Sequence, residues 1–232
     1  METRTRQMAR DFLIPLLLLP ALTALIGVTG MDLALQEACY VAGKGWIYGD
    51  QQPWRFLYRT GIFPSFTVAI VATIVLVTGF FSARAYISRK AALFPLLFML
   101  LGPWLVGHET VKQQWGRPRP SQLQLFGGGR QFHHPWERGE PGRGASFPSG
   151  HAAMAFSMIW PYFLLRRSAP ALARLAFALG ACYWLLMGIA RMVQGAHFVS
   201  DVVWSAGIVY LVGLALYYLL RLDRNVLMSR GE

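Results

Sequence analysis

The feature that most constrains the fold of this chain is a set of apolar stretches that contain no charged residue. They cover residues 12–30, 60–83, 91–107, 152–165, 175–190 and 202–220. About 20 apolar residues cross a bilayer as a helix, so the first, second and sixth stretches are long enough. The chain is 55% hydrophobic and only 14% charged, a balance typical of membrane proteins. The sequence predicts one all-α membrane domain over residues 1–232.

The other three stretches are shorter, and each meets polar residues at one end. The third leads into residues 108–112, the fourth follows residues 149–151, and the fifth leads into Arg191. We expect each helix to continue past its apolar run into the headgroup region, where polar groups are tolerated. The sequence therefore predicts six transmembrane helices and a polar site near one membrane surface.

Basic residues give the chain a net charge of +11, and their distribution predicts its orientation. They do not gather on one soluble element, so we expect no nucleic acid partner. Most flank the predicted helices in four groups: Arg4, Arg6 and Arg10; Arg84, Arg89 and Lys90; Arg166, Arg167 and Arg174; and Arg221, Arg224 and Arg230. The positive-inside rule makes these groups and both termini cytoplasmic.

Two segments then fall on the outer side of the membrane. The first, residues 31–59, contains a short amphipathic helix over 31–41 and several aromatic residues that we expect to anchor the surface without chemistry: Trp46, Tyr48, Trp54, Phe56 and Tyr58. The second, residues 116–148, is an extracytoplasmic loop far longer than helix connections usually are. It is rich in arginine, which the positive-inside rule disfavours there, so we expect a function to retain it.

Three short blocks carry residues suited to catalysis. They are Lys112 with Arg119-Pro120, then Pro148-Ser149-Gly150-His151, then Arg191 with His197 and Asp201. The predicted topology places the outer ends of the third to sixth helices at the same surface, although none of these residues was used to derive that topology. We therefore expect the three blocks to form one site.

The cations and the Ser149 block are typical of a phosphate site. Lys112, Arg119 and Arg191 provide permanent positive charge, and arginine matches phosphate oxygens bidentately. Ser149 is a good N-cap, so we expect the backbone N–H groups of residues 149–151 to point at a bound anion. Gly150 allows the backbone to come close.

The two histidines in the blocks complete the predicted chemistry. His197 and Asp201 lie four residues apart, so on one helix the carboxylate accepts the Nδ1 proton and leaves Nε2 as a lone pair. That nitrogen is placed for attack on phosphorus, which gives a phosphohistidine. His151 then serves as acid and base. The cations stabilise the transition state, so we expect no metal and no cofactor.

These blocks resemble the signature of the type 2 phosphatidic acid phosphatase superfamily, which reads K-x6-RP, PSGH and SR-x5-H-x3-D. The spacing within each block is kept, and Ala190 replaces the usual serine. The resemblance implies phosphate binding by Lys112, Arg119, Ser149, Gly150 and Arg191, a nucleophile at His197, an acid/base at His151 and an orienting carboxylate at Asp201. Soluble vanadium haloperoxidases share the signature, but the apolar stretches argue against that branch.

The resemblance implies hydrolysis of a membrane lipid phosphate, either a phosphomonoester or a diphosphate. Trp115-Gly116-Arg117 and Phe126-Gly127-Gly128 are also similar to bacterial lipid A phosphatases of the inner membrane. Phosphatidylglycerophosphate phosphatases share the same blocks, so the lipid stays open. The expected location is the bacterial inner membrane, with the site on the periplasmic face. Two alternatives are phosphate transfer to a second lipid and transport of a lipid phosphate without bond cleavage.

A few ionisable residues have no clear role in the sequence. Glu109 is placed to pair with Lys112 on one helical face. Arg117, Arg130, Arg138 and Arg143 are suited either to a second phosphate or sugar or to solvent. His133 and His134 are adjacent, and adjacent side chains rarely bind one ion together, so we expect structural or surface roles for them.

Overall fold

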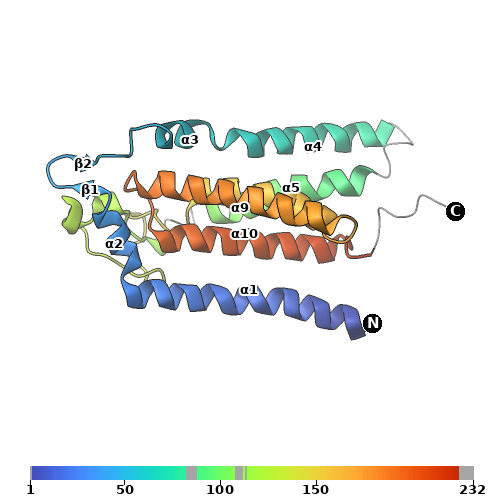
Figure 1. Ribbon diagram of the computed structural model, residues 1–232, viewed down its shortest axis with the longest axis horizontal. Coiled ribbons are helices and arrows are strands. Elements are labelled where there is room, and N and C mark those ends of the chain that lie inside the picture. The colour runs from blue at the N-terminus through green and yellow to red at the C-terminus, as the bar shows by residue number, and fades with distance from the viewer. Residues whose placement is uncertain (1, 82–87, 108–111, 113, 225–232) are drawn as a thin grey trace.

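The computed structural model describes residues 2–81, 88–107, 112 and 114–224. Five long helices lie side by side along its longest dimension (Figure 1). They are α1 (Glu2–Thr29), α4 (Phe63–Phe81), α5 (Ser88–Gly107), α9 (Pro170–Met192) and α10 (Val199–Leu219). Five of the apolar stretches are thereby confirmed as helices. Arg84, Arg230, His108 and Glu109, to which the sequence gave roles, lie outside the described residues.

Four helical segments in the described part of the chain are long and apolar enough to cross a membrane. They are Arg4–Thr29, Trp54–Phe81, Pro170–Met192 and Val199–Leu219. A fifth, Ala91–Leu105, is apolar but shorter. Many large apolar side chains of α1 and α4 are exposed, including Leu17 at 62% and Ile70 at 60%, as lipid-facing helices require. The chain is a multi-pass membrane protein, and crossing by the third and fourth apolar stretches stays a prediction.

The fourth apolar stretch forms a broken helix in the middle of the bundle. It consists of α7 (Gly150–Phe156), the 3₁₀ turn η4 (Ser157–Ile159) and α8 (Trp160–Leu165), and it packs against α5, α9 and α10. Ile159 and Phe163 are fully buried. The Phe163 ring lies 5.5 Å from Phe94 and 5.6 Å from Tyr210. Because its neighbours are other helices rather than lipid, this segment needs neither the length nor the continuity of a lipid-exposed span.

Figure 1 shows that α1 begins and α10 finishes at the same end of the bundle, and polar side chains join the helices there. Arg4 pairs with Asp223, and Arg166 lies 2.7 Å from Asp11. The Tyr218 hydroxyl also donates to Asp11 at 2.8 Å. This end therefore carries Arg4 and Arg166, which come from two of the four groups that the sequence predicts to be cytoplasmic.

The opposite end of the bundle is covered by the outer connection, residues 31–59. This segment contains α2 (Met31–Glu37), the antiparallel strands β1 (Tyr40–Val41) and β2 (Gly45–Trp46), and α3 (Trp54–Thr60). Gly30 has a φ of +66°, a conformation that glycine adopts at little cost, and it lets the chain turn sharply from α1 into α2. The expected amphipathic helix is confirmed over 31–37, but its polar residues Asp32 and Gln36 point inward and are buried.

The long loop at the same end is packed rather than extended. It contains the 3₁₀ turns η2 (Pro120–Gln122) and η3 (Gln124–Phe126). Leu123 and Phe126 are buried with Phe198 in a small apolar core, against which Tyr40 and Trp46 pack. The loop and the outer connection therefore form one covering layer over the ends of α9 and α10.

Candidate active site

His197 lies in the short segment between α9 and α10, and it is only 2% exposed. Its Nδ1 lies 2.7 Å from the backbone oxygen of Ser146 and 3.7 Å from Oδ2 of Asp201. A carbonyl oxygen only accepts hydrogen bonds, so Nδ1 carries the proton and Nε2 of the neutral ring has the lone pair. The expected tautomer follows, but its main acceptor is the Ser146 carbonyl. At 3.7 Å the Asp201 carboxylate is the more distant acceptor of the two.

Asp201 acts on His197 through Ser146. Its Oδ2 accepts the Ser146 hydroxyl at 2.6 Å and the Phe198 N–H at 2.8 Å. Its other oxygen, Oδ1, accepts a hydrogen bond from the Arg117 guanidinium at 2.5 Å, so both carboxylate oxygens have hydrogen-bond partners. A short polar chain thus runs from Asp201 through Ser146 to the ring of His197. Asp201 lies in the first turn of α10, but His197 precedes that helix, so the two do not share one helical face as the spacing predicted. We expect the carboxylate to orient the histidine indirectly.

Arg117 is fully buried beside this carboxylate. Its guanidinium also donates to Asp32 and to the backbone oxygen of His133, each at 2.8 Å, and it lies 4.4 Å from the centre of the Phe198 ring. A cation buried between two carboxylates and saturated with hydrogen bonds is a fixed structural charge. From the sequence, Arg117 was suited either to a contact with the ligand or to solvent. Its position two residues before Arg119 was the only sign of a role inside the site.

Asp32 extends the same network to the outer connection. Its two oxygens accept the backbone N–H of Ser200 at 2.9 Å and the Ser200 hydroxyl at 2.6 Å. These residues bind one another through buried polar atoms and lie directly behind His197. We call them the support cluster: Asp32, Arg117, Ser146, Ser200 and Asp201.

The outer connection also holds the backbone of His197. The Gln36 side chain donates to the His197 carbonyl at 3.1 Å, and the Trp46 indole N–H donates to Gln36 at 3.1 Å. Tyr58 lies beneath the Arg191 guanidinium, with 4.4 Å from its Cζ to the ring centre, and 5.2 Å from the His151 ring. The interpretation of Trp46 and Tyr58 as surface anchors without a role at the site is therefore wrong, because both contact residues of the three blocks or their supports.

His151 shares one electrostatic environment with the other blocks. Burial lowers the pKa of its imidazole, and Arg191, His197, Lys112 and Arg119 lower it further, to about 4. This effect requires all five groups to be close together. Lys112 is buried, Arg119 is half-buried just before η2, and Arg191 is buried in the last turn of α9. The structure thus brings the three predicted blocks to one place.

The pKa of His197 is also lowered, to about 4. Burial is the largest cause, the negative charge of Asp201 opposes it, and Lys112 and Arg191 add to the lowering. Both histidines are neutral at pH 7 in this structure. A bound phosphate dianion would offset the cations and raise both pKa values, which favours protonation of His151 only once substrate is present.

Two buried polar atoms at the site have no hydrogen-bond partner within the described ranges. They are the Ser149 hydroxyl oxygen and Nε of Arg191. Buried donors are normally satisfied, so both are available to an oxyanion. Ser149 is the N-cap of α7, as expected, yet its side chain makes no cap bond. Its backbone N–H donates to the Asp201 carbonyl at 3.1 Å, so the prediction that this N–H points at the anion is wrong.

Backbone contacts join the first and third blocks. The N–H of Ser121 donates to the Gly195 carbonyl at 3.0 Å, and the N–H of Arg119 donates to the Gln122 side chain at 2.9 Å. Gly150 begins α7 beside Ser149. Through these contacts the segment that carries Arg119 is fixed relative to the turn that carries His197.

The remaining candidates lie apart from the reacting centre. The His134 ring stacks on Trp136 at 4.5 Å, and His133 offers its backbone oxygen to Arg117. No group of three or more His, Cys, Asp or Glu side chains within the described ranges is placed to hold a metal ion. The expected pairing of Glu109 with Lys112 lies outside the described residues.

Known proteins share both the sequence and the fold. A family model described as the PAP2 superfamily matches residues 91–224. The chain is 32% identical to a lipid A 4′-phosphatase of Francisella tularensis subsp. novicida over 68% of this chain and 71% of that one. It is 34% identical to a lipid A 4′-phosphatase of Rhizobium leguminosarum over 77% and 79%.

A solved structure is similar over almost the whole chain. It is the crystal structure of a transmembrane PAP2 type phosphatidylglycerolphosphate phosphatase from Bacillus subtilis, with a TM-score of 0.53 and 22% identity over 95% of this chain and 99% of that one. The likeness in fold, the matched family model and the relatives agree with the three blocks. The chain therefore belongs to the PAP2 superfamily, and it is a multi-pass membrane lipid phosphatase of that kind.

Proposed function

We propose that this protein hydrolyses the phosphate ester of a membrane glycolipid of the lipid A type through a phosphohistidine on His197. The observation that supports the proposal most directly is the arrangement around His197. Its Nδ1 proton is fixed by Ser146, so Nε2 is the nucleophilic nitrogen. The buried donors of Ser149 and Arg191 are available to the phosphate oxygens.

The first step forms a bond between Nε2 of His197 and phosphorus and breaks the bond from phosphorus to the lipid oxygen. His151 donates a proton to that oxygen, which leaves as the lipid alcohol. Lys112, Arg119 and Arg191 stabilise the charge on the transferring phosphoryl group. The imidazolium formed at His197 is stabilised by Asp201 through Ser146 and through the 3.7 Å separation of their charges.

The second step returns the site to its starting state. His151, now neutral, removes a proton from water, and the oxygen of that water attacks phosphorus. The bond to Nε2 breaks, and inorganic phosphate leaves. We propose that the three cations perform the charge stabilisation that a metal ion performs in many phosphoryl transfer enzymes, so that the reaction is independent of added metal.

Two curated relatives support a glycolipid substrate, since both are named lipid A 4′-phosphatase. Lipid A carries its phosphates on a sugar headgroup. Lipid diphosphates and phosphatidylglycerophosphate are the runners-up, because the three blocks do not distinguish between these lipids. The enzyme family disfavours the alternative of transport without bond cleavage.

The proposed location is the bacterial inner membrane with six spans and the site at the periplasmic face. The site and its covering layer lie at one end of the bundle, and the basic residues near Arg4 and Arg166 lie at the other. The positive-inside rule makes the latter end cytoplasmic. The site then opens at the outer ends of the third to sixth predicted helices.

The test uses purified protein in detergent with four lipids: lipid A, phosphatidylglycerophosphate, phosphatidic acid and a polyprenyl diphosphate. We expect inorganic phosphate to be released fastest from lipid A, and EDTA should not affect the rate. The amount of phosphate should equal the amount of dephosphorylated lipid, which is identified by its mass. An alkaline quench during turnover should retain labelled phosphate on His197. Faster release from another lipid would reject the substrate class, and loss of activity in EDTA would reject metal independence.

The same assay decides between hydrolysis and transfer to a second lipid. Hydrolysis gives one inorganic phosphate for each dephosphorylated lipid, whereas transfer gives a newly phosphorylated acceptor lipid and little free phosphate. We expect the first result in mixed micelles that contain an excess of unphosphorylated lipid.

A further inference from the structure

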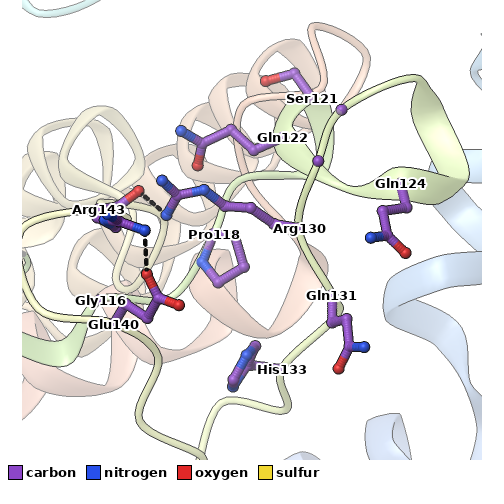
Figure 2. A pocket seen from close by; sticks show the side chains of 12 residues that line it. Gly116, Pro118, Ser121, Gln122, Gln124, Arg130, Gln131, His133, Glu140 and Arg143 are labelled. Atoms are coloured by element: carbon purple, nitrogen blue, oxygen red, sulfur yellow. Dashed lines mark hydrogen bonds and ion pairs between the residues drawn. The ribbon is translucent and has the colours of Figure 1, made fainter.

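A polar cavity lies in the outer loop next to the active site (Figure 2). Its volume is about 750 Å³, which is within the range of small-molecule sites. The sequence left Arg130 and Arg143 open between a second phosphate or sugar and solvent. The main polar side chains that line the cavity come from this loop: Gln122, Gln124, Arg130, Gln131, His133 and Arg143. The catalytic steps described above use none of these side chains.

The cavity is joined to the catalytic segment by one wall. Pro118, Ser121 and Gln122 line it, and they flank Arg119 on both sides in the sequence. Gln122 accepts the Arg119 N–H at 2.9 Å, and the Ser121 N–H is bonded to Gly195 in the turn that leads to His197. A ligand whose phosphate contacts Arg119 therefore has the cavity beside it.

The lining chemistry is that of a carbohydrate site. Glutamine amides both donate and accept hydrogen bonds, as sugar hydroxyl groups do, and Gln124 and Gln131 lie on the side of the cavity opposite Arg143 (Figure 2). An acyl chain would leave these amides without partners, which costs free energy. The cavity therefore favours a polar ligand with many hydroxyl groups.

The charge of the cavity favours an anionic group on that ligand. Arg143 is 2.9 Å from Glu140, so these two charges offset one another. Arg130 donates to the backbone oxygen of Arg143, and no carboxylate in the described part of the chain forms an ion pair with it. One net positive charge thus remains at this side of the cavity.

We propose that this cavity binds the saccharide part of a phosphorylated glycolipid headgroup, with a second anionic group near Arg130, while the reacting phosphate lies among Arg119, Ser149 and Arg191. This inference rests on the proposed function and specifies how the glycolipid is selected. The headgroup of phosphatidic acid is its phosphate alone, with no sugar attached, so this lipid gains nothing from the cavity.

The first test measures binding without turnover, in detergent, to protein with the His197→Ala substitution. Two probes are used: inorganic phosphate, and a deacylated glucosamine disaccharide that carries two phosphates. Calorimetry measures the affinity for each probe. Adding Arg130→Gln together with Gln131→Ala should weaken binding of the disaccharide about tenfold, since each change removes a hydrogen bond or charge contact. The affinity for inorganic phosphate should not change, and Arg138→Gln, an exposed arginine of the same loop, should change neither. Equal disaccharide affinity, or a parallel loss for both probes, would overturn the proposal.

The second test separates the sugar from the anionic group. Arg130→Gln alone should lower the affinity for the disaccharide with two phosphates more than the affinity for the same disaccharide with one phosphate. The reason is that a single phosphate occupies the catalytic position and leaves no anionic group near Arg130. Equal losses would overturn the anionic part of the proposal. Gln131→Ala should weaken both disaccharides alike, and no loss with either would overturn the saccharide part.

The third test is kinetic and uses His197 intact. The double substitution at Arg130 and Gln131 should raise the KM for the glycolipid about tenfold and leave kcat/KM for phosphatidic acid unchanged. Similar losses on both lipids would contradict a headgroup site. Wild-type protein that hydrolyses neither lipid would contradict the proposed function instead, and the binding test would still decide on the cavity.

Discussion

The buried groups behind His197 and those that face the proposed phosphate differ in their hydrogen bonding. In the support cluster, Asp201 accepts from three residues and Arg117 donates to four. On the phosphate side, the Ser149 hydroxyl and Nε of Arg191 bind no described residue. Saturated groups have one low-energy position, whereas unsaturated donors gain energy only when a ligand arrives. On the proposed mechanism, the first set positions the nucleophile and the second set binds the phosphate.

The largest expected effect comes from removing the nucleophile between these two regions. His197→Ala should lower kcat about 10⁴-fold or more, because no other group can form the phosphohistidine. His134→Ala, which removes a ring stacked on Trp136 outside the site, should retain most activity. Phosphate release assays on both proteins provide the measurement, and near-normal turnover by His197→Ala would reject the assignment.

The next effect tests the support cluster. Arg117→Lys keeps the charge but cannot donate to Asp32, Asp201 and His133 together. We expect kcat to fall about 100-fold, the scale of a small misplacement of a catalytic group, with little change in the affinity for inorganic phosphate. Arg138→Lys in the same loop is the matched control.

Asp32→Asn adds a second, milder test of the cluster, since it preserves shape and removes one charge. It should also lower kcat while the affinity for phosphate stays the same. Folding of each variant is checked by its elution profile and its phosphate affinity. Full kcat in folded Arg117→Lys would mean that Arg117 has no positioning role, and full kcat in folded Asp32→Asn would mean the same for Asp32.

A smaller effect is expected on the phosphate side. Ser149→Ala should weaken the binding of inorganic phosphate and of vanadate about tenfold, which is the contribution of one hydrogen bond to a charged group. Its thermal stability should not fall, because the hydroxyl makes no protein hydrogen bond in the described structure. Ser146→Ala is the informative contrast, since its hydroxyl donates to Asp201 at 2.6 Å. That variant should lose stability and kcat instead. The reverse pattern would invalidate the distinction between the two regions.

The smallest expected effect is the response of His197 to mild acid. The pKa of this buried ring is lowered from 6.5 to about 4, so it should stay neutral from pH 7 to about 5 in protein without phosphate. The unfolded chain takes up that proton near pH 6.5, so acidification from 6.5 toward 4 favours unfolding. Nitrogen NMR of labelled histidine, assigned with His197→Ala, gives the midpoint. A midpoint at or above 6 would contradict burial of a neutral ring.

The sequence predicted much of this site because the blocks are local. His197 and Asp201 come close because they are only four residues apart, across the start of α10, and the uncharged stretches follow from the cost of burying charge in lipid. The convergence of Lys112, His151 and Arg191 at one surface followed from topology. These arguments need only the order of residues along the chain.

The contacts behind His197 were beyond the reach of such arguments. Asp32 and Arg117 are 85 residues apart, and an aspartate near a membrane surface is ordinarily read as solvated. Trp46 was interpreted as an interfacial anchor, although it donates to Gln36, whose side chain in turn donates to the His197 carbonyl. Long-range pairs of this kind depend on how the outer connection folds over the bundle, which no local pattern specifies.

The sequence by itself therefore determined the membrane class and the family, and it supplied the candidates for the reacting residues, because hydrophobic length and motif spacing are properties of short segments. The tertiary structure decided which group accepts the Nδ1 proton, which arginine is structural and which donors stay available. These outcomes depend on competition between partners within about 3 Å, and that competition is settled only when distant segments pack together.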